Sequence, residues 1–149
     1  MFTNFEIMGS NSKVHFFFKK KGFSLKNRSV LKKFIESIFR RERKKLASLN
    51  YIFCSDKDLL NINRQFLNHD FYTDIITFDL SVSDKVDAEV YISVDRVREN
   101  AEKMKVSFKS ELHRVLFHGV LHLCSYNDKT KRDKAEMTSK EDFYLKQYQ

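Results

Sequence analysis

Residues 88–123 have the sequence AEVYISVDRVRENAEKMKVSFKSELHRVLFHGVLHL, and the spacing of their apolar side chains changes near residue 94. Apolar and polar residues alternate in 88–93, which is typical of a β-strand with one buried face. After residue 94 the apolar residues recur at helical spacing, first over 95–105 and then in a strongly apolar helix from Ser107 to Leu123. A strand that leads into two helices predicts a protein of the α/β (α+β) class.

The segments on either side extend this pattern. Apolar runs predict strands over 14–18, 51–54 and 73–80, and the last of these is expected to form an antiparallel hairpin with 88–93. Helical spacing predicts three further helices. The first has its apolar positions at Val30, Leu31, Phe34, Ile35, Ile38, Phe39, Leu46 and Leu49. The second follows a cap at Ser55 or Asp56 and has Leu59, Leu60, Ile62 and Phe66 on its apolar face, and the third follows residue 132. We therefore expect one domain over residues 1–149, a small mixed β-sheet covered by helices, with these residues of the apolar helix in the core: Leu112, Val115, Leu116 and Leu123.

Length and composition fit one globular domain, because the chain has 149 residues of which 42% are hydrophobic and 32% are charged. No run of 18 apolar residues is present and the N-terminus lacks the pattern of a signal peptide, so we expect a cytoplasmic protein that does not enter a membrane. Cys54 and Cys124 are too few for a disulfide framework. We expect both to be reduced, buried thiols.

Positive charge is concentrated in the first third of the chain. Residues 1–50 contain 13 lysines and arginines against three acidic residues, while the remainder is slightly acidic. One dense run contains Arg40, Arg41, Arg43, Lys44 and Lys45, and it suits contact with a polyanion such as a nucleic acid. A solvated lysine-rich face is the alternative interpretation of the same run.

Two histidines are the strongest candidates for chemistry. His118 and His122 are four residues apart, so in a helix they share one face and can bind one metal ion. Asp128 lies six residues further on, beyond a polar break, where a reversal of the chain could return its carboxylate to the pair. Imidazole and carboxylate are acceptable zinc ligands, and three protein ligands leave a fourth position open for water. Packing or surface polarity is the alternative role for the two histidines.

The string around the histidines, HGVLHLCSYND over 118–128, resembles the His-Gly-x-x-His-Leu-x-Gly-Tyr-x-His signature of the YbeY endoribonuclease family. The resemblance extends to other blocks: Leu60-Asn61, Thr73-Asp74-Ile75-Ile76-Thr77-Phe78, Ala88-Glu89-Val90-Tyr91-Ile92-Ser93 and Glu111-Leu112. Order and spacing match over about residues 51–144. The resemblance implies one divalent ion per chain, with zinc preferred, and cleavage of single-stranded RNA, specifically ribosomal RNA, rather than DNA.

Four positions depart from the family pattern. Asp128 stands at the usual third histidine, which makes the ligand set harder and more anionic. Ser125 and Ala88 both replace glycine. The arginine that usually precedes the Thr-Asp block would align near Leu67, so its role falls to Arg64, which we also expect to contact RNA, or to the residues considered next.

Three residues are candidates for proton transfer or for contact with a phosphate. Glu111 and Arg114 precede His118 by seven and four residues, so both fall near the histidine stripe. His69 precedes the Thr-Asp block. The alternatives are a helix-dipole role for Glu111 and a plain loop at His69. Asp74 is expected to order the start of its strand, with catalysis as the alternative role. His113, on another face of the helix, is expected to be structural or exposed.

Hydrolysis is the natural reaction class for such a site. Zinc peptidases place a glutamate directly after the first histidine, but this chain has Gly119 there. A peptidase is therefore disfavoured, and the resemblance to the YbeY family implies a metal-dependent endoribonuclease that matures ribosomal RNA and associates with that RNA or the ribosome. Two alternatives remain: a metal-dependent hydrolase of peptides or small molecules, and a non-catalytic RNA-binding module associated with the ribosome.

Overall fold

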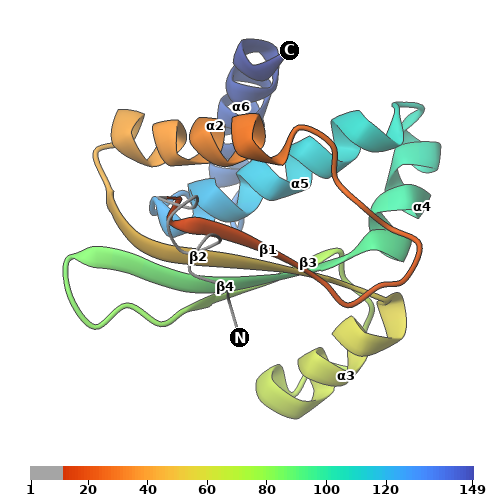
Figure 1. The fold of residues 1–149 in the computed structure, drawn as a ribbon. Coiled ribbons are helices and arrows are strands. Elements are labelled where there is room, and N and C mark those ends of the chain that lie inside the picture. Colours follow the sequence, from red (N-terminus) through yellow and green to blue (C-terminus); the bar gives the residue numbers. More distant parts are fainter. Residues whose placement is uncertain (1–11) are drawn as a thin grey trace, which may run out of the picture.

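The computed structural model describes residues 12–149, and its centre is a four-stranded sheet (Figure 1). The strand order is β1-β2-β4-β3, with β1 parallel to β2, β2 parallel to β4 and β3 antiparallel to β4. The strands are β1 Val14–Phe18, β2 Lys45–Cys54, β3 Ile75–Asp79 and β4 Lys85–Ser93. The mixed sheet and the β3–β4 hairpin are as the sequence predicts.

Helices cover both faces of this sheet. They are α2 Arg28–Arg41, α3 Asp56–Leu67, α4 Val94–Met104, α5 Phe108–Leu123 and α6 Lys131–Tyr148. Figure 1 shows α2 and α5 above the sheet, α3 below one end of it, and α6 behind α5. None of the helices in residues 12–149 combines the length and the apolar composition that a membrane-spanning helix needs. The expected α/β class is confirmed.

The first predicted helix was wrong beyond residue 41. Arg43 has a left-handed backbone with φ of 60°, and the N–H of Lys44 donates to the carbonyl of Phe39, which ends α2. Leu46 and Leu49 belong to β2, where a bulge between Leu46 and Ser48 adds one residue. Because of that extra residue, both leucines point to the same face although they are three apart, a spacing that mimics a helix.

The helix starts follow from short polar side chains. Ser55 accepts a hydrogen bond from the N–H of Asp58 and forms a capping box, and Thr130 does the same with Asp133. Ser107 accepts from the N–H of Ser110 at the start of α5. The predicted starts of α3 and α5 are thereby confirmed.

The apolar face of α5 forms the centre of the core. The predicted core residues of this helix are all buried: Leu112, Val115, Leu116 and Leu123. Gly119 faces the sheet, and a Cβ built there would lie 3.2 Å from Cδ1 of Ile75 and 3.4 Å from Cγ1 of Val90. This close approach holds α5 directly over β3 and β4. The same placement leaves no room for a catalytic glutamate at position 119.

Both cysteines are buried and neither forms a disulfide, as the sequence predicts. Burial raises the pKa of Cys54 to about 11 and that of Cys124 to about 12. Thiols with such pKa values are protonated at neutral pH and behave as small apolar groups.

Candidate metal and phosphate site

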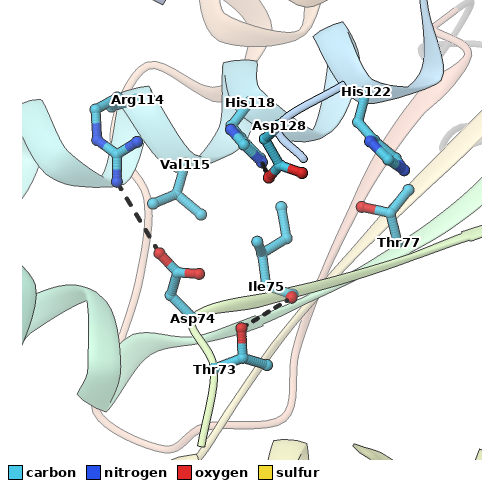
Figure 2. A pocket seen from close by; sticks show the side chains of 9 residues that line it. All are labelled: Thr73, Asp74, Ile75, Thr77, Arg114, Val115, His118, His122 and Asp128. Atoms are coloured by element: carbon cyan, nitrogen blue, oxygen red, sulfur yellow. Dashed lines mark hydrogen bonds and ion pairs between the residues drawn. The ribbon is translucent and has the colours of Figure 1, made fainter. Parts of the chain in front are cut away.

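A cavity of about 310 Å³ lies between α5 and the start of β3. Figure 2 shows its lining: Thr73, Asp74, Ile75, Thr77, Arg114, Val115, His118, His122 and Asp128. Three separate segments therefore meet there, namely β3 with the residues before it, α5, and the turn between α5 and α6. Five of the lining side chains carry groups that can bind a metal ion, hold a proton or contact a phosphate.

The three predicted metal ligands all line this cavity. His118 and His122 project from successive turns of α5, and Figure 2 shows Thr77 below His122. Nε2 of His118 lies 3.5 Å from Oδ2 of Asp128, which comes from the turn after the helix. The chain reversal that the sequence predicts does bring Asp128 back to the first histidine. His122 and Asp128 are exposed, whereas His118 is half-buried.

Glu141 of α6 holds the other nitrogen of His118. Its Oε2 lies 2.6 Å from Nδ1 of His118, and its Oε1 accepts from Nη1 of Arg114 at 3.2 Å. When Nδ1 donates to this carboxylate, Nε2 is the nitrogen that faces the cavity. Glu141 is only 3% exposed, so it acts from within the protein rather than from the cavity.

Arg114 is held on two further sides. Glu111, buried in α5, accepts from Nε at 2.7 Å and from Nη2 at 2.5 Å, which is a bidentate pair. Nη2 also lies 4.0 Å from Oδ2 of Asp74. The bond to Glu111 is the main cause of a raised pKa at Arg114, so the guanidinium stays charged.

Two further groups in the cavity, besides Arg114, have shifted pKa values. Burial raises the pKa of Asp74, although Arg114 and His118 oppose the shift. Burial alone would lower the pKa of His118, but the hydrogen bond and charge of Glu141, helped by Asp128 and Asp74, raise it instead. Perturbed titratable groups gathered in one cavity are typical of a functional site.

The donor set fits a divalent cation. Four carboxylates surround one guanidinium and one imidazole here: Asp74, Glu111, Asp128 and Glu141 with Arg114 and His118. This excess of negative charge favours a bound cation and disfavours a phosphate on its own. Within residues 12–149, no three His, Cys, Asp or Glu side chains are already gathered at ligand distance. Complete coordination therefore requires the exposed side chains of His122 and Asp128 to turn toward His118.

Known proteins resemble this chain along most of its length. The family model described as "Endoribonuclease YbeY" matches residues 15–149. The chain belongs to the YbeY family. It is 49% identical over 132 residues to the Endoribonuclease YbeY of Cytophaga hutchinsonii, covering 87% of this chain and 92% of that protein. It is 48% identical over 124 residues to that of Flavobacterium psychrophilum, covering 83% and 89%.

A solved structure agrees with the YbeY assignment. The solution structure of TM1509 from Thermotoga maritima has a TM-score of 0.64 and 27% sequence identity, covering 91% of this chain and 88% of that one. The family match begins at residue 15 and so includes β1 and α2, where the sequence offered no motif. The predicted resemblance to YbeY endoribonucleases is confirmed.

The turn after α5 shows how this YbeY chain accommodates a departure from the family pattern. Ser125 has a φ of 78°, the left-handed conformation that glycine adopts freely and that costs another residue about 1 kcal/mol. The next residue, Tyr126, donates from its hydroxyl to Glu42 at 2.7 Å. Glu42 also accepts from Lys140 and from the hydroxyl of Tyr144, so the end of α2 and α6 together hold the turn that carries Asp128.

Other predicted site residues lie outside the cavity lining. His69 is exposed and its ring stacks on Phe71, while Arg64 pairs with Asp70 on the surface of α3. Glu111 is buried under Arg114. Leu67, at the position of the family arginine, is exposed on α3 and does not line the cavity.

The basic run divides between two places. Arg40, Lys44 and Lys45 line a second cavity of about 420 Å³ together with Lys13, Glu36, Phe39, Leu46 and Lys85. Arg41 lies over the ring of Phe143 instead, and Arg43 forms the turn after α2. The sequence predicted that this run lies on one continuous basic helix, which is wrong. Because α2 ends at Arg41, the run consists of the end of a helix, a turn and the start of β2.

Sequence reasoning missed Glu141 entirely and placed catalysis by Asp74 second to a structural role. Glu141 reaches His118 because α6 packs along α5, and a separation of 23 residues carries no local signal of that contact. Asp74 was within reach of prediction, since it stands beside Thr73 in a matched block and both line the cavity.

Proposed function

We propose that the chain is a metal-dependent endoribonuclease that cleaves single-stranded RNA during maturation of ribosomal RNA of the small subunit and in ribosome quality control. We further propose that it works in the cytoplasm, in contact with ribosomal RNA or the ribosome, as one domain spanning residues 1–149. The observation that carries this proposal is the cavity lined by two histidines and a returning aspartate, within a chain of the YbeY endoribonuclease family.

His118, His122 and Asp128 are the proposed ligands of one divalent ion. The two imidazoles favour zinc, whereas the aspartate keeps harder divalent ions possible. When bound, such an ion supplies Lewis-acid stabilisation of the negative charge that grows on a phosphoryl oxygen during hydrolysis. Glu141 fixes the ring of His118 so that Nε2 points toward the cavity.

Asp74 is the proposed site of proton transfer. Apart from the proposed ligand Asp128, it is the one residue of the cavity lining that has a carboxylate. Burial raises the pKa of Asp74 toward the range in which a group can both accept and donate a proton. Glu111 is less suited to this task, because both of its oxygens already accept from Arg114. Arg114, also in the lining, offsets charge on the phosphate from the opposite side.

The second cavity is the proposed contact for the rest of the RNA strand. Four of its five cations have no ion pair with any residue in 12–149; Lys45 lies 3.5 Å from Asp84. Strand β4 links the two cavities: Lys85 lines the second, and Val90 pairs with Thr77, which lines the first. These two residues of β4 are five positions apart, which corresponds to about 17 Å along the strand. One RNA strand can therefore reach both cavities. Arg64 is a further proposed contact, at the surface of α3, where RNA would compete with Asp70 for its guanidinium.

Salt dependence tests this basic surface. Replacing Arg40 and Lys44 with alanine should weaken RNA binding and reduce the slope of log K against log salt by about one for each phosphate that the variant no longer neutralises. Lys57→Ala, an exposed lysine on α3, is the control and should leave the slope unchanged. Equal slopes for the wild type and the double variant would contradict the proposed binding of RNA at the second cavity.

Cleavage of matched substrates tests the activity. The purified protein, loaded in turn with zinc, manganese and magnesium, is offered a labelled single-stranded segment of ribosomal RNA, the same segment annealed to its complement, and an unstructured peptide. We expect cleavage of the single strand only. Binding of RNA without cleavage by any metal form would favour the non-catalytic module, and cleavage of the peptide would favour a different hydrolase.

A further inference from the structure

The loop between α3 and β3 exposes aromatic rings directly beside the candidate cleavage cavity. Phe71 and Tyr72 are 54% and 53% exposed. The next two residues, Thr73 and Asp74, both line the cavity. Since neighbouring Cα atoms are about 3.8 Å apart, the Cα atoms that carry the two rings lie within roughly 4 Å and 8 Å of the Cα of Thr73 in the cavity lining.

Hydrogen bonds tie this loop to α3 although its rings are exposed. Asn63, buried in α3, donates from its side-chain Nδ2 to the backbone carbonyl of Phe71 at 2.9 Å. The backbone carbonyl of Asn63 accepts from the N–H of His69 at 3.1 Å. The rings of His69 and Phe71 are stacked, with centroids 5.0 Å apart and planes 23° apart. Exposed rings that are fixed in advance lose little conformational entropy when a flat partner binds.

The charges around the loop are already neutralised. Arg64 pairs with Asp70 at 2.5 Å, and Arg96, which pairs with Asp56 at 2.6 Å, lies over the ring of Tyr72 with its Cζ 4.9 Å from the centroid. His69 takes one face of the Phe71 ring and Arg96 one face of the Tyr72 ring, so the surface offers the remaining exposed part of each ring rather than free positive charge. A nucleobase suits such a surface better than a phosphate does, because bases stack on aromatic side chains. The phosphates have their own cations in the second cavity.

We propose that Phe71 and Tyr72 form a stacking platform for unpaired bases next to the bond that is cut. This inference rests on the proposed ribonuclease function and adds the part of the substrate that the loop recognises. The occupant follows from the position of the two rings directly beside the cavity. When the phosphate of a nucleotide lies beside Asp74, a neighbouring base of the same strand lies against Phe71 and Tyr72. Bases held in a duplex must first be unpaired and unstacked to reach the rings, which costs free energy, so the platform favours single strands.

A binding cycle tests the platform without depending on cleavage. In a His118→Ala background, Phe71→Ala and Tyr72→Ala are compared with Leu80→Ala, an equally exposed apolar residue just after β3. The ligands are one single-stranded RNA and a series in which each position in turn lacks its base. We expect Phe71→Ala and Tyr72→Ala to bind the intact RNA about 5- to 100-fold more weakly than the His118→Ala background does. Leu80→Ala should bind as the background does, and Phe71→Trp should bind more tightly than Phe71→Ala, close to the background affinity.

The base-deleted RNAs give the decisive readout. With the loop intact, removing the base at one or two positions should weaken binding. Each such removal should have no further effect on the variant that lacks the ring against which that base stacks, because the two changes delete one interaction. Unchanged affinity of both variants, or full sensitivity to base removal in both, would overturn the platform and leave the rings as a surface for a protein. Failure of the wild type to cleave RNA would count against the proposed function alone, since the binding cycle does not use cleavage.

Discussion

Replacing Glu141 with alanine tests the network that supports the cavity. The carboxylate is buried and binds two groups, His118 at 2.6 Å and Arg114 at 3.2 Å. Removing one partner of a buried charged pair costs about 3 to 5 kcal/mol, and Arg114 keeps its two bonds to Glu111, so we expect the lower end, about 3 kcal/mol. For a chain of this size that loss lowers the melting temperature by roughly 6 to 12 °C.

Urea denaturation and metal titration measure the two consequences. Free of its carboxylate partner, the ring of His118 is no longer oriented, so metal affinity should fall about 10- to 100-fold. Glu136→Ala, at an exposed position of the same helix, is the matched control and should change neither quantity. A stability loss no larger than that of the control, together with wild-type metal affinity, would refute the role assigned to Glu141.

Three further substitutions test separate parts of the fold. Burial, with a smaller effect of Lys109, lowers the pKa of His113 to about 4, so on acidification the unfolded chain takes up a proton near pH 6.5 before the folded chain does. The free energy of unfolding should therefore fall as pH drops from 6.5 toward 4, by up to about 1.4 kcal/mol per pH unit. His113→Phe should remove this contribution to the pH dependence in urea titrations. Glu42→Gln should speed amide hydrogen exchange in residues 125–130 without slowing or speeding exchange in β4, because it weakens the bonds that hold Tyr126; identical exchange in the turn would contradict this anchor. Gly119→Ala should cost about 1 to 3 kcal/mol in denaturant unfolding, because its Cβ would lie 3.2 Å from Ile75, and a wild-type midpoint would show that α5 has room to shift.

Local patterns predicted most elements of this fold because their signals are local. Ser55 and Ser107 stand directly before helices that they cap, and alternation in 88–93 marks β4. The end of α2 could not be predicted in this way. Its left-handed residue is Arg43 rather than glycine, and the bulge in β2 gave Leu46 and Leu49 a helical spacing.

The candidate site divides along the same line. His118 and His122 share a helix face, so their spacing predicts that they act together, and the family pattern adds Asp128. Glu141 contacts His118 only because of how α6 docks, which depends on the whole packed core rather than on nearby residues. His69 and Arg64 illustrate the opposite case: they are close in sequence to Asp74, but the loop and helix that carry them leave both outside the cavity lining.

The single-turnover rate of RNA cleavage tests the central claim most directly. One labelled single-stranded ribosomal RNA is mixed with excess metal-loaded protein, so that differences in turnover do not enter. We predict that the wild type cleaves this RNA and that His118→Ala, saturated with the same RNA, cleaves it at least about 100-fold more slowly. Cleavage by His118→Ala at the wild-type rate would contradict the claim that the cavity beneath α5 is the catalytic centre.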